Sequence, residues 1–208
     1  MATPANASLS TVTDSWGSEA SLSCDGCYRW WLRRCLSTGE GCLLFLGLNP
    51  SRADGQRDDP TLRRLIGFAR QWGYRELVVL NLFARISPSP AALLRVKDPI
   101  GGQNDAILKR WFTHWSLTSG VDLWCGWGVN GARLDRAQVI FQAIQPLLPQ
   151  RRRSVPDSPH PLMLGRTASG QPRHPLYAPR NACLLPFLWA DPEPIRHPVG
   201  TLTDVFSS

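Results

Sequence analysis

The sequence predicts an α/β fold with three layers, α/β/α, around a central, mainly parallel sheet of about four strands. Continuous apolar runs of strand length lie at 42–48, 77–80 and 121–125, as expected of parallel strands covered on both faces. Between the first two, apolar residues recur at helical spacing over 61–72, so strand, helix and strand form a βαβ unit. A fourth strand is expected at 161–164.

The segment 61–72 has clear helix-boundary signals. Asp59 is expected to cap its start, with Pro60 at the first helical position, and Gly73 to end it.

Further elements follow from periodicity. A short strand is expected at 20–23, and helical spacing predicts helices over 104–115 and over 132–148, the latter breaking near Pro146. The segment 28–36 places arginines between apolar residues at helical spacing, which predicts an amphipathic helix.

Length and composition predict one globular domain over 20–190, with a flexible tail at 1–19 and another at 191–208. Hydrophobic residues make up 43% of the 208-residue chain, and no apolar run approaches the ~20 residues of a membrane helix. The start lacks the basic and apolar regions of a signal peptide. We therefore expect a cytoplasmic protein without a membrane span, acting as a monomer.

The chain is basic, with a net charge of +7 and a pI near 9.5. Most of the cations are arginines, whose planar guanidinium groups suit phosphate, so nucleic acid is the leading class of partner. A basic pI that only maintains solubility is the alternative. The run at 151–153 is expected to be a linker or an exposed basic loop, which would suit a DNA backbone or be only a solvated charge run.

Cysteine spacing leaves a metal site open as an alternative. A Cys-x-x-Cys pair is followed by two further thiols, at Cys24, Cys27, Cys35 and Cys42. The later spacings match no metal module, so we expect no metal and no other cofactor.

Polar and glycine-rich segments follow the expected strands, at the edge where open parallel sheets bind ligands. They are Gly-Leu-Asn-Pro-Ser at 47–51, Asn-Leu-Phe at 81–83 and Gly-Trp-Gly-Val-Asn at 126–130, while the fourth strand leads toward Arg-His-Pro-Leu-Tyr at 173–177.

This order of loops resembles the uracil-DNA glycosylase superfamily, and the Gly-x-Asn-Pro form resembles its mismatch-specific branch. The chain also resembles, more closely and over about residues 20–189, an uncharacterised bacterial domain family with the pattern LNPS-x-AD…DDPT…GFAR-x-WGY…NLFA…RHPLY. The first resemblance implies a uracil-DNA glycosylase-like fold and cleavage of an N-glycosidic bond. The second implies membership of a family defined by sequence.

The glycosylase resemblance implies three catalytic candidates. Asn49 would hold the attacking water, and His174 would donate a hydrogen bond to the departing base. An Asn is a poor general base, so a nearby carboxylate is expected, Asp54 first and Asp58 second. The chain has His-Pro-Leu-Tyr where the glycosylases have His-Pro-Ser, which leaves the phosphate contacts of the missing Ser open.

The remaining candidates would hold the base and the DNA. Asn81 would read the base edge through its amide, with Phe83 and Trp127 lining the pocket. Leu176 or Tyr177 would fill the space left by a flipped base. Arginines around the cleft are the candidates for contacts with DNA phosphates, namely Arg52, Arg57, Arg63, Arg173 and Arg180.

The expected function is therefore a metal-independent, DNA glycosylase-like hydrolase that flips a base, modified or unmodified, out of double-stranded DNA, in repair or in defence against phages. The main alternative is a non-catalytic module of the same fold that binds DNA, RNA or a nucleotide. A thiol or metal enzyme centred on Cys24 and Cys27 is the third reading.

Overall fold

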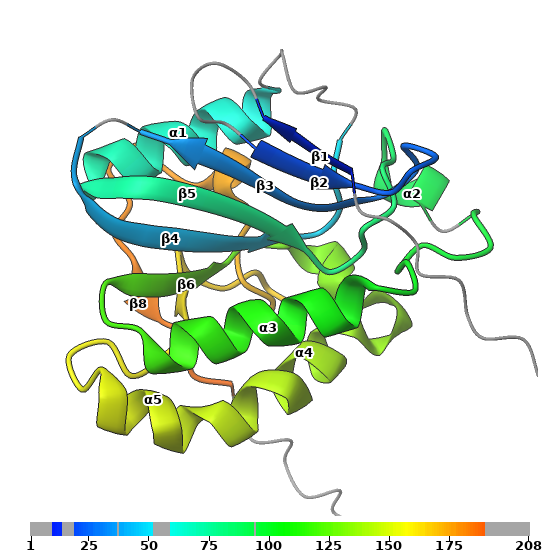
Figure 1. The fold of residues 1–208 in the computed structure, drawn as a ribbon. Helices are drawn as coiled ribbons and strands as arrows, with labels where there is room; N and C mark the ends of the chain where they lie inside the picture. Colours follow the sequence, from blue (N-terminus) through cyan, green and yellow to red (C-terminus); the bar gives the residue numbers. More distant parts are fainter. Residues whose placement is uncertain (1–9, 14–18, 37, 52–58, 94, 190–208) are drawn as a thin grey trace, which may run out of the picture.

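The computed structural model describes residues 10–13, 19–36, 38–51, 59–93 and 95–189. Within these ranges eight strands form one sheet in the order β1-β2-β3-β5-β4-β6-β7-β8 (Figure 1). The strands are β1 (Ser10–Thr13), β2 (Glu19–Leu22), β3 (Arg29–Cys35), β4 (Glu40–Gly47), β5 (Tyr74–Asn81), β6 (Val121–Cys125), β7 (Leu162–Met163) and β8 (Leu185–Pro186).

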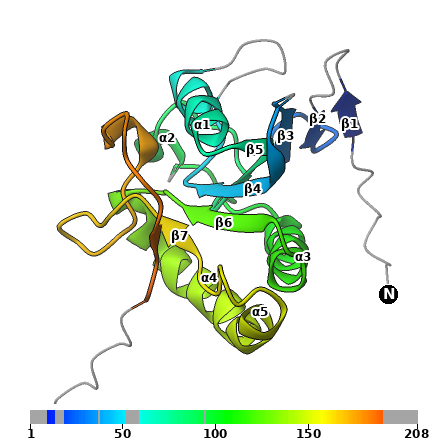
Figure 2. The same ribbon diagram turned by 90° about the vertical axis from the view of Figure 1, so that its left-hand side faces the viewer.

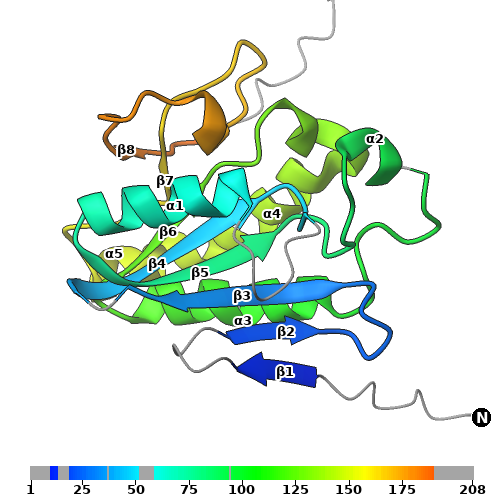
Figure 3. The ribbon, with the colours of Figure 1, turned by 90° about the horizontal axis from the view of Figure 1, so that it is seen from above.

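The centre of the sheet is parallel, as predicted. β4 pairs in parallel with β5 on one side and β6 on the other, and β6 pairs in parallel with β7. The predicted count of about four strands is wrong, because antiparallel strands extend both edges. β3, β2 and β1 follow one another outward from β5 (Figure 3), and β8 pairs with β7. β1 lies within the segment 1–19 that we expected to be a tail.

Helices cover both faces of this sheet. Figure 2 shows α1 on one face and α3, α4 and α5 on the other. The α-helices are α1 (Pro60–Gln71), α2 (Pro90–Leu93), α3 (Asn104–Leu117), α4 (Arg136–Ile144) and α5 (Leu148–Ser154); short 3-10 helices are η1 (Val129–Asp135), η2 (Gln145–Leu147) and η3 (Pro175–Tyr177).

Burial of β4 explains its continuous apolar run. Leu44 and Leu46 belong to the core cluster beneath α3 and α4, whereas Leu43 and Phe45 belong to the cluster beneath α1. Because successive side chains of a strand point to opposite faces, a strand covered on both faces has no polar position to alternate with.

The helix expected at 28–36 is wrong, since this segment is β3. Trp30, Leu32 and Arg34 are buried at alternate positions, whereas Trp31 and Arg33 between them are more exposed. This is the two-residue period of a strand. This alternation of buried and more exposed positions was not recognised in the sequence, because Arg34 occupies a buried position and an arginine is ordinarily expected at the surface.

The boundary signals of α1 are confirmed. The Asp59 carboxylate accepts a hydrogen bond of 2.7 Å from the backbone N–H of Leu62, Pro60 opens the helix, and Gly73 follows its end with a φ of +79°.

The helix expected over 132–148 begins at Arg136 and is interrupted at η2, which contains Pro146. After the interruption α5 includes 151–153, so the prediction of a linker or loop there is wrong. The Arg151 side chain is fully buried.

Among the described residues, no helix has both the length and the apolar composition that a membrane crossing requires.

Candidate functional site

A cavity of about 490 Å³ lies at the carboxyl edge of the parallel strands. From β4 the chain crosses to β5 on one side and then to β6 on the other, so the loops after β4 and β6 diverge at the point where the strand order reverses. Open α/β sheets bind ligands at such a point, and the volume falls within the range of about 300–1,000 Å³ of small-molecule sites. Six of the candidate residues line it, namely Asn49, Asn81, Trp127, His174, Leu176 and Tyr177.

Asn49 is held by its amide nitrogen. Its Nδ2 donates to the carbonyl oxygens of Pro50 at 2.9 Å and Ser87 at 3.1 Å. Because both partners are acceptors, the two bonds distinguish the nitrogen from the oxygen of this amide. The Oδ1 atom of Asn49 is thereby left to accept a hydrogen bond from a molecule in the cavity.

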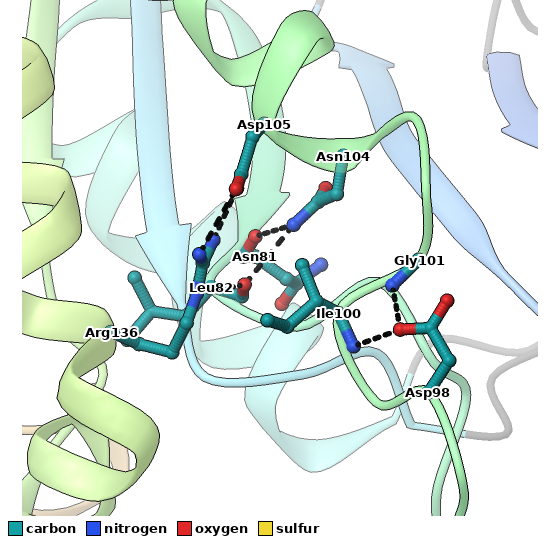
Figure 4. Close-up of polar contacts among 8 residues, drawn as sticks. All are labelled: Asn81, Leu82, Asp98, Ile100, Gly101, Asn104, Asp105 and Arg136. Atoms are coloured by element: carbon teal, nitrogen blue, oxygen red, sulfur yellow. Dashed lines mark hydrogen bonds and ion pairs between the residues drawn. The ribbon is translucent and has the colours of Figure 1, made fainter.

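Asn81 presents a buried amide to the cavity. The residue is only 3% exposed, and its Nδ2 has no hydrogen-bond partner among the described residues. Its backbone is held from the opposite side, because Asn104 Nδ2 donates to the carbonyl oxygens of Asn81 and Leu82, each at 3.1 Å (Figure 4). Arg136 Nε donates to the same Leu82 oxygen, while its guanidinium pairs with Asp105.

His174 lines the cavity in its neutral form. Its Nδ1 accepts a hydrogen bond from the backbone N–H of Leu176 at 3.3 Å, so the proton of the neutral ring lies on Nε2. Burial lowers the pKa of His174 below its ordinary value, and the charge of Asp59 opposes this shift only in part. The loop after β6 approaches closely, since a Cβ added at Gly128 would lie 3.3 Å from the Cβ of His174.

Phe45 is a cavity residue that the sequence reading missed. A Cβ at Gly47 would lie 2.9 Å from the Phe45 ring, and one at Gly126 would lie 2.5 Å from it, so both loops need glycine here. Phe83, expected in this role, is not among the cavity residues. It is fully buried beneath α3 and α4, with the Arg136 guanidinium 5.9 Å from its ring centroid.

Trp127 is fixed in the cavity wall. The residue is 1% exposed, and its Nε1 donates to Gln171 Oε1 at 2.8 Å. A Cβ at Gly131 would lie 1.8 Å from the ring, so the start of η1 packs directly against it.

Exposed apolar side chains surround the mouth of the cavity. Tyr177 is 80% exposed, Val129 is 58% exposed and Leu176 is 44% exposed, although all three also line the cavity.

The described arginines among the candidates for phosphate contacts lie outside the lining of the cavity. Arg63 and Arg180 are exposed and Arg173 is half-buried, and none of the three lines the cavity. Three candidates, Arg52, Asp54 and Arg57, and the second carboxylate, Asp58, lie outside the described residues.

Arg29 and Asp59 are charged cavity residues whose role there was not expected. Arg29 begins β3 and is only 7% exposed. Burial lowers its pKa to about 10, and the nearby Asp59 charge offsets part of that shift. Both carboxylate oxygens of Asp59 are engaged, one by the Leu62 N–H and the other by the Ser51 hydroxyl. No signal in the sequence singled out Arg29, because its segment had the spacing of an amphipathic helix.

The described residues contain no group of three or more His, Cys, Asp or Glu side chains that could hold a metal ion. The four cysteines considered as ligands are all described. Cys42 is buried in β4, while Cys35 and Cys24 are exposed. The alternative of a four-cysteine site is therefore not supported.

A family model described as "Protein of unknown function (DUF1643)" matches residues 29–176. No curated protein and no solved structure matches the chain. The matched region covers more than half of the chain and includes Asn49, Asn81 and His174. The chain therefore belongs to the DUF1643 family of proteins of unknown function.

Proposed function

We propose that this protein is a metal-independent, DNA glycosylase-like hydrolase that flips a base out of double-stranded DNA and cleaves its N-glycosidic bond. One observation carries the proposal: Asn49 after β4, Asn81 at the end of β5 and His174 after β7 line the same cavity, although they are far apart in the sequence. The expected setting is DNA repair or defence against phages with modified bases.

The reaction needs a positioned water and stabilisation of charge on the base. The bond from C1′ of the deoxyribose to the base nitrogen breaks, and its electron pair leaves with the base. The water oxygen bonds to C1′, and the proton that the water loses ends on the base or in solvent. Asn49 Oδ1 suits the water, since it accepts a hydrogen bond, and His174 Nε2–H suits a base oxygen that becomes negative.

The buried Asn81 amide supports recognition of a base. An unpartnered buried donor costs about 1–3 kcal/mol, and a base carbonyl that accepts from Asn81 Nδ2 would recover this energy. An analogue without that oxygen would leave the donor unpaired, which is how a polar site rejects the wrong ligand.

The exposed side chains at the mouth of the cavity support the proposal that a flipped base enters it. A flipped base leaves a gap in the stack, and apolar or aromatic side chains fill such gaps. Tyr177, next to His174 with ring centroids 5.9 Å apart, and Leu176 are exposed where this role requires them. Arg63, Arg173 and Arg180 remain candidates for backbone phosphates, with Arg52 and Arg57.

The general base remains proposed as Asp54, with Asp58 second. Asp59 is the one carboxylate among the described cavity residues, and capping of α1 and the Ser51 hydroxyl occupy both of its oxygens. This favours a second candidate function, a non-catalytic module that binds DNA, RNA or a nucleotide in the same cavity.

Asn49→Ala separates the two functions. Duplexes containing uracil, mismatched thymine or bulky modified cytosines are incubated with the protein and treated with alkali, which cleaves strands at sites that have lost a base. We expect the wild-type chain to cut at least one duplex and Asn49→Ala to lose about 100-fold or more in rate while still binding DNA, since positioning of a reactant contributes such a factor.

Asn181→Ala is the matched control, because Asn181 is exposed and does not line the cavity. It should cut at the wild-type rate. A folded wild-type chain that binds DNA and leaves the whole panel intact would favour the non-catalytic module.

A further inference from the structure

Three polar side chains lie behind the part of the cavity wall that carries Asn81. Asn104 and Asp105 begin α3, and Arg136 begins α4 (Figure 4). Asn104 and Arg136 are both fully buried. None of the three lines the cavity, so none of them is placed to touch a ligand there. We refer to Asn104, Asp105 and Arg136 as the α3–α4 cluster.

The start of α3 gains no cap from this cluster. Asn and Asp are residue types that commonly cap helices, but the N-cap position of α3 is Gln103, whose side chain makes no capping hydrogen bond. Instead, Asn104 Nδ2 donates to the carbonyl oxygens of Asn81 and Leu82. Asn104 Oδ1 is buried and has no hydrogen-bond partner among the described residues. The Asn104 side chain therefore serves the chain that leaves β5 rather than its own helix.

The chain that leaves β5 is held from two sides. From α4, Arg136 Nε donates to the same Leu82 oxygen that Asn104 bonds. From the loop after β4, the carbonyl oxygens of the two residues that precede Asn49 accept from the backbone N–H groups of Leu82 and Phe83, each at 2.9 Å. This short segment therefore connects the α3–α4 cluster with both asparagines of the cavity.

Arg136 extends the cluster to another wall of the cavity. Its guanidinium forms two hydrogen bonds with the Asp105 carboxylate, from Nη1 at 3.2 Å and from Nη2 at 2.5 Å. The two residues before it, Leu134 and Asp135, have left-handed backbones with φ of +51° and +52°, which is unfavourable for residues other than glycine. Bonding of Arg136 fixes the end of this turn, and with it η1, whose first residue, Val129, lines the cavity.

The position of the Asn81 amide depends on this support. Because its buried Nδ2 has no partner among the described residues, a backbone shift that brought it to an acceptor or to water would be favourable. A group stays in such an unfavourable state only where the surrounding bonds fix it. A donor that is already held in place also costs less ordering when a ligand binds.

We propose that Asn104, together with Arg136, is a positioning residue that holds the Asn81 amide and the loop of Asn49 in the geometry that the ligand requires. The inference rests on the proposed function of the cavity as a nucleobase site. Neither Asn104 nor Arg136 touches the ligand, and each acts through the backbone of residues 81–83. Removing the Asn104 donor should therefore change the alignment of the cavity residues while leaving their identities unchanged.

The first test needs no ligand and uses the full chain. Side-chain ¹⁵N relaxation of Asn81 Nδ2, with the signal assigned by its loss in Asn81→Asp, reports how firmly the amide is held. Amide hydrogen exchange of Leu82 and Phe83 reports local opening of the segment. Asn104→Leu keeps the approximate size of the side chain and removes its donor. We expect it to lower the Asn81 order parameter and to accelerate exchange at both amides about tenfold, as loss of a hydrogen bond predicts.

The second test is cleavage of the duplex that the wild-type chain cuts fastest in the DNA panel. We expect Asn104→Leu to lower kcat by about 100-fold, because a small misplacement of the reacting groups has an effect of this size. KM should change little, since the residues that would contact DNA are all retained.

Ser116→Ala is the matched control. Ser116 is also a buried polar residue of α3, but its hydroxyl donates to a carbonyl oxygen of its own helix, that of Thr113, at 2.8 Å. The Asn81 order parameter, the exchange of the two amides and kcat should all keep their wild-type values in this variant.

Arg136→Lys is the second variant. It keeps a cation beside Asp105 but lacks the Nε–H that bonds Leu82, so exchange at Leu82 and Phe83 should rise by a smaller factor, about threefold. Thermal unfolding verifies that each variant is folded. If Asn104→Leu does not fold, the presence or absence of this acceleration in Arg136→Lys decides.

Wild-type exchange and relaxation in folded Asn104→Leu, or equal changes in Ser116→Ala, would overturn the inference. The exchange and relaxation measurements do not depend on DNA cleavage. If they change as expected while the wild-type chain cuts no duplex, the positioning role of Asn104 is supported and the hydrolase is contradicted. If the wild-type chain cuts DNA and folded Asn104→Leu retains its kcat, the hydrolase is supported and the positioning role is contradicted.

Discussion

At the scale of single residues, His174 connects the chemistry of the cavity with its pH dependence. Because Nδ1 accepts a hydrogen bond from the Leu176 N–H, the neutral ring carries its proton on Nε2 and can donate from there. Burial lowers the pKa of His174, which favours the neutral ring at neutral pH. The same shift makes the free energy of unfolding depend on pH, because the unfolded chain binds the proton more readily than the folded one.

We therefore predict a smaller acid sensitivity in His174→Gln. Above the ordinary pKa of 6.5 both states are neutral and the shift contributes nothing. As the pH falls through 6.5 the unfolded state is protonated first, so stability declines until the pH reaches the lower folded pKa. Urea unfolding at about pH 8 and about pH 5 should show a smaller loss in the variant than in the wild type.

A second histidine, His160, also contributes to the acid sensitivity of both proteins. Burial and the charge of Arg152 also lower the pKa of His160, so part of the acid sensitivity persists in His174→Gln. Identical losses in variant and wild type would contradict the prediction, as would an imidazole NMR titration of His174 with its midpoint at or above 6.5.

Some cavity residues follow from sequence, and others do not. Asn49, Asn81 and His174 stand in loops expected near the carboxyl edge of the sheet, so their meeting could be predicted from strand order; their roles remain predictions. Phe45 and Arg29 could not be found in this way. Phe45 lies within a uniformly apolar run, and Arg29 lies in a segment whose spacing indicated a helix.

At the scale of elements, α1 and β3 show which elements can be predicted from local sequence signals and which cannot. The Asp-Pro start of α1 is a local signal, since the cap is made within one turn, and the structure confirms it. β3 depends on its neighbours, because it is a strand through pairing with β2 and β5. Two arginines of β3, Arg29 and Arg34, are buried, so a pattern that places charged side chains at the surface does not identify this strand.

The cap of α1 predicts a measurable stability difference. Asp59→Ala removes the acceptor for the Leu62 N–H and for the Ser51 hydroxyl, and should lower the free energy of unfolding by about 1–2 kcal/mol in urea denaturation. Asp59→Asn is the matched control, because its amide oxygen still caps the helix, and it should recover most of the loss. Equal losses in both variants would show that the charge, and not the cap, matters.

At the scale of the whole molecule, the two edges of the parallel strands differ. The cavity lies at their carboxyl edge, and a polar cluster lies at their amino edge. There Asp122, on β6, accepts hydrogen bonds from the hydroxyls of Tyr74 and Ser158 and from the guanidinium of Arg151. Burial and this bond raise the pKa of Tyr74. β5, β6 and α5 are thereby joined at one point, which sequence periodicity could not predict because its partners are distant in the chain.

Arg151 also bonds the carbonyl oxygens of Trp115 and Thr118, so it ties the end of α3 to α5 and β6. We predict that Arg151→Met lowers the free energy of unfolding by about 3–5 kcal/mol, because it removes a buried donor from Asp122 and from three carbonyl oxygens, those of Trp115, Thr118 and Ser158. Urea denaturation measures the loss. Arg152→Met, at an exposed position of the same helix, should change stability by less than about 0.5 kcal/mol. Since the cluster lies at the opposite edge from the cavity, folded Arg151→Met should cut the DNA duplexes at the wild-type rate, and a lower rate would show that the two edges are coupled.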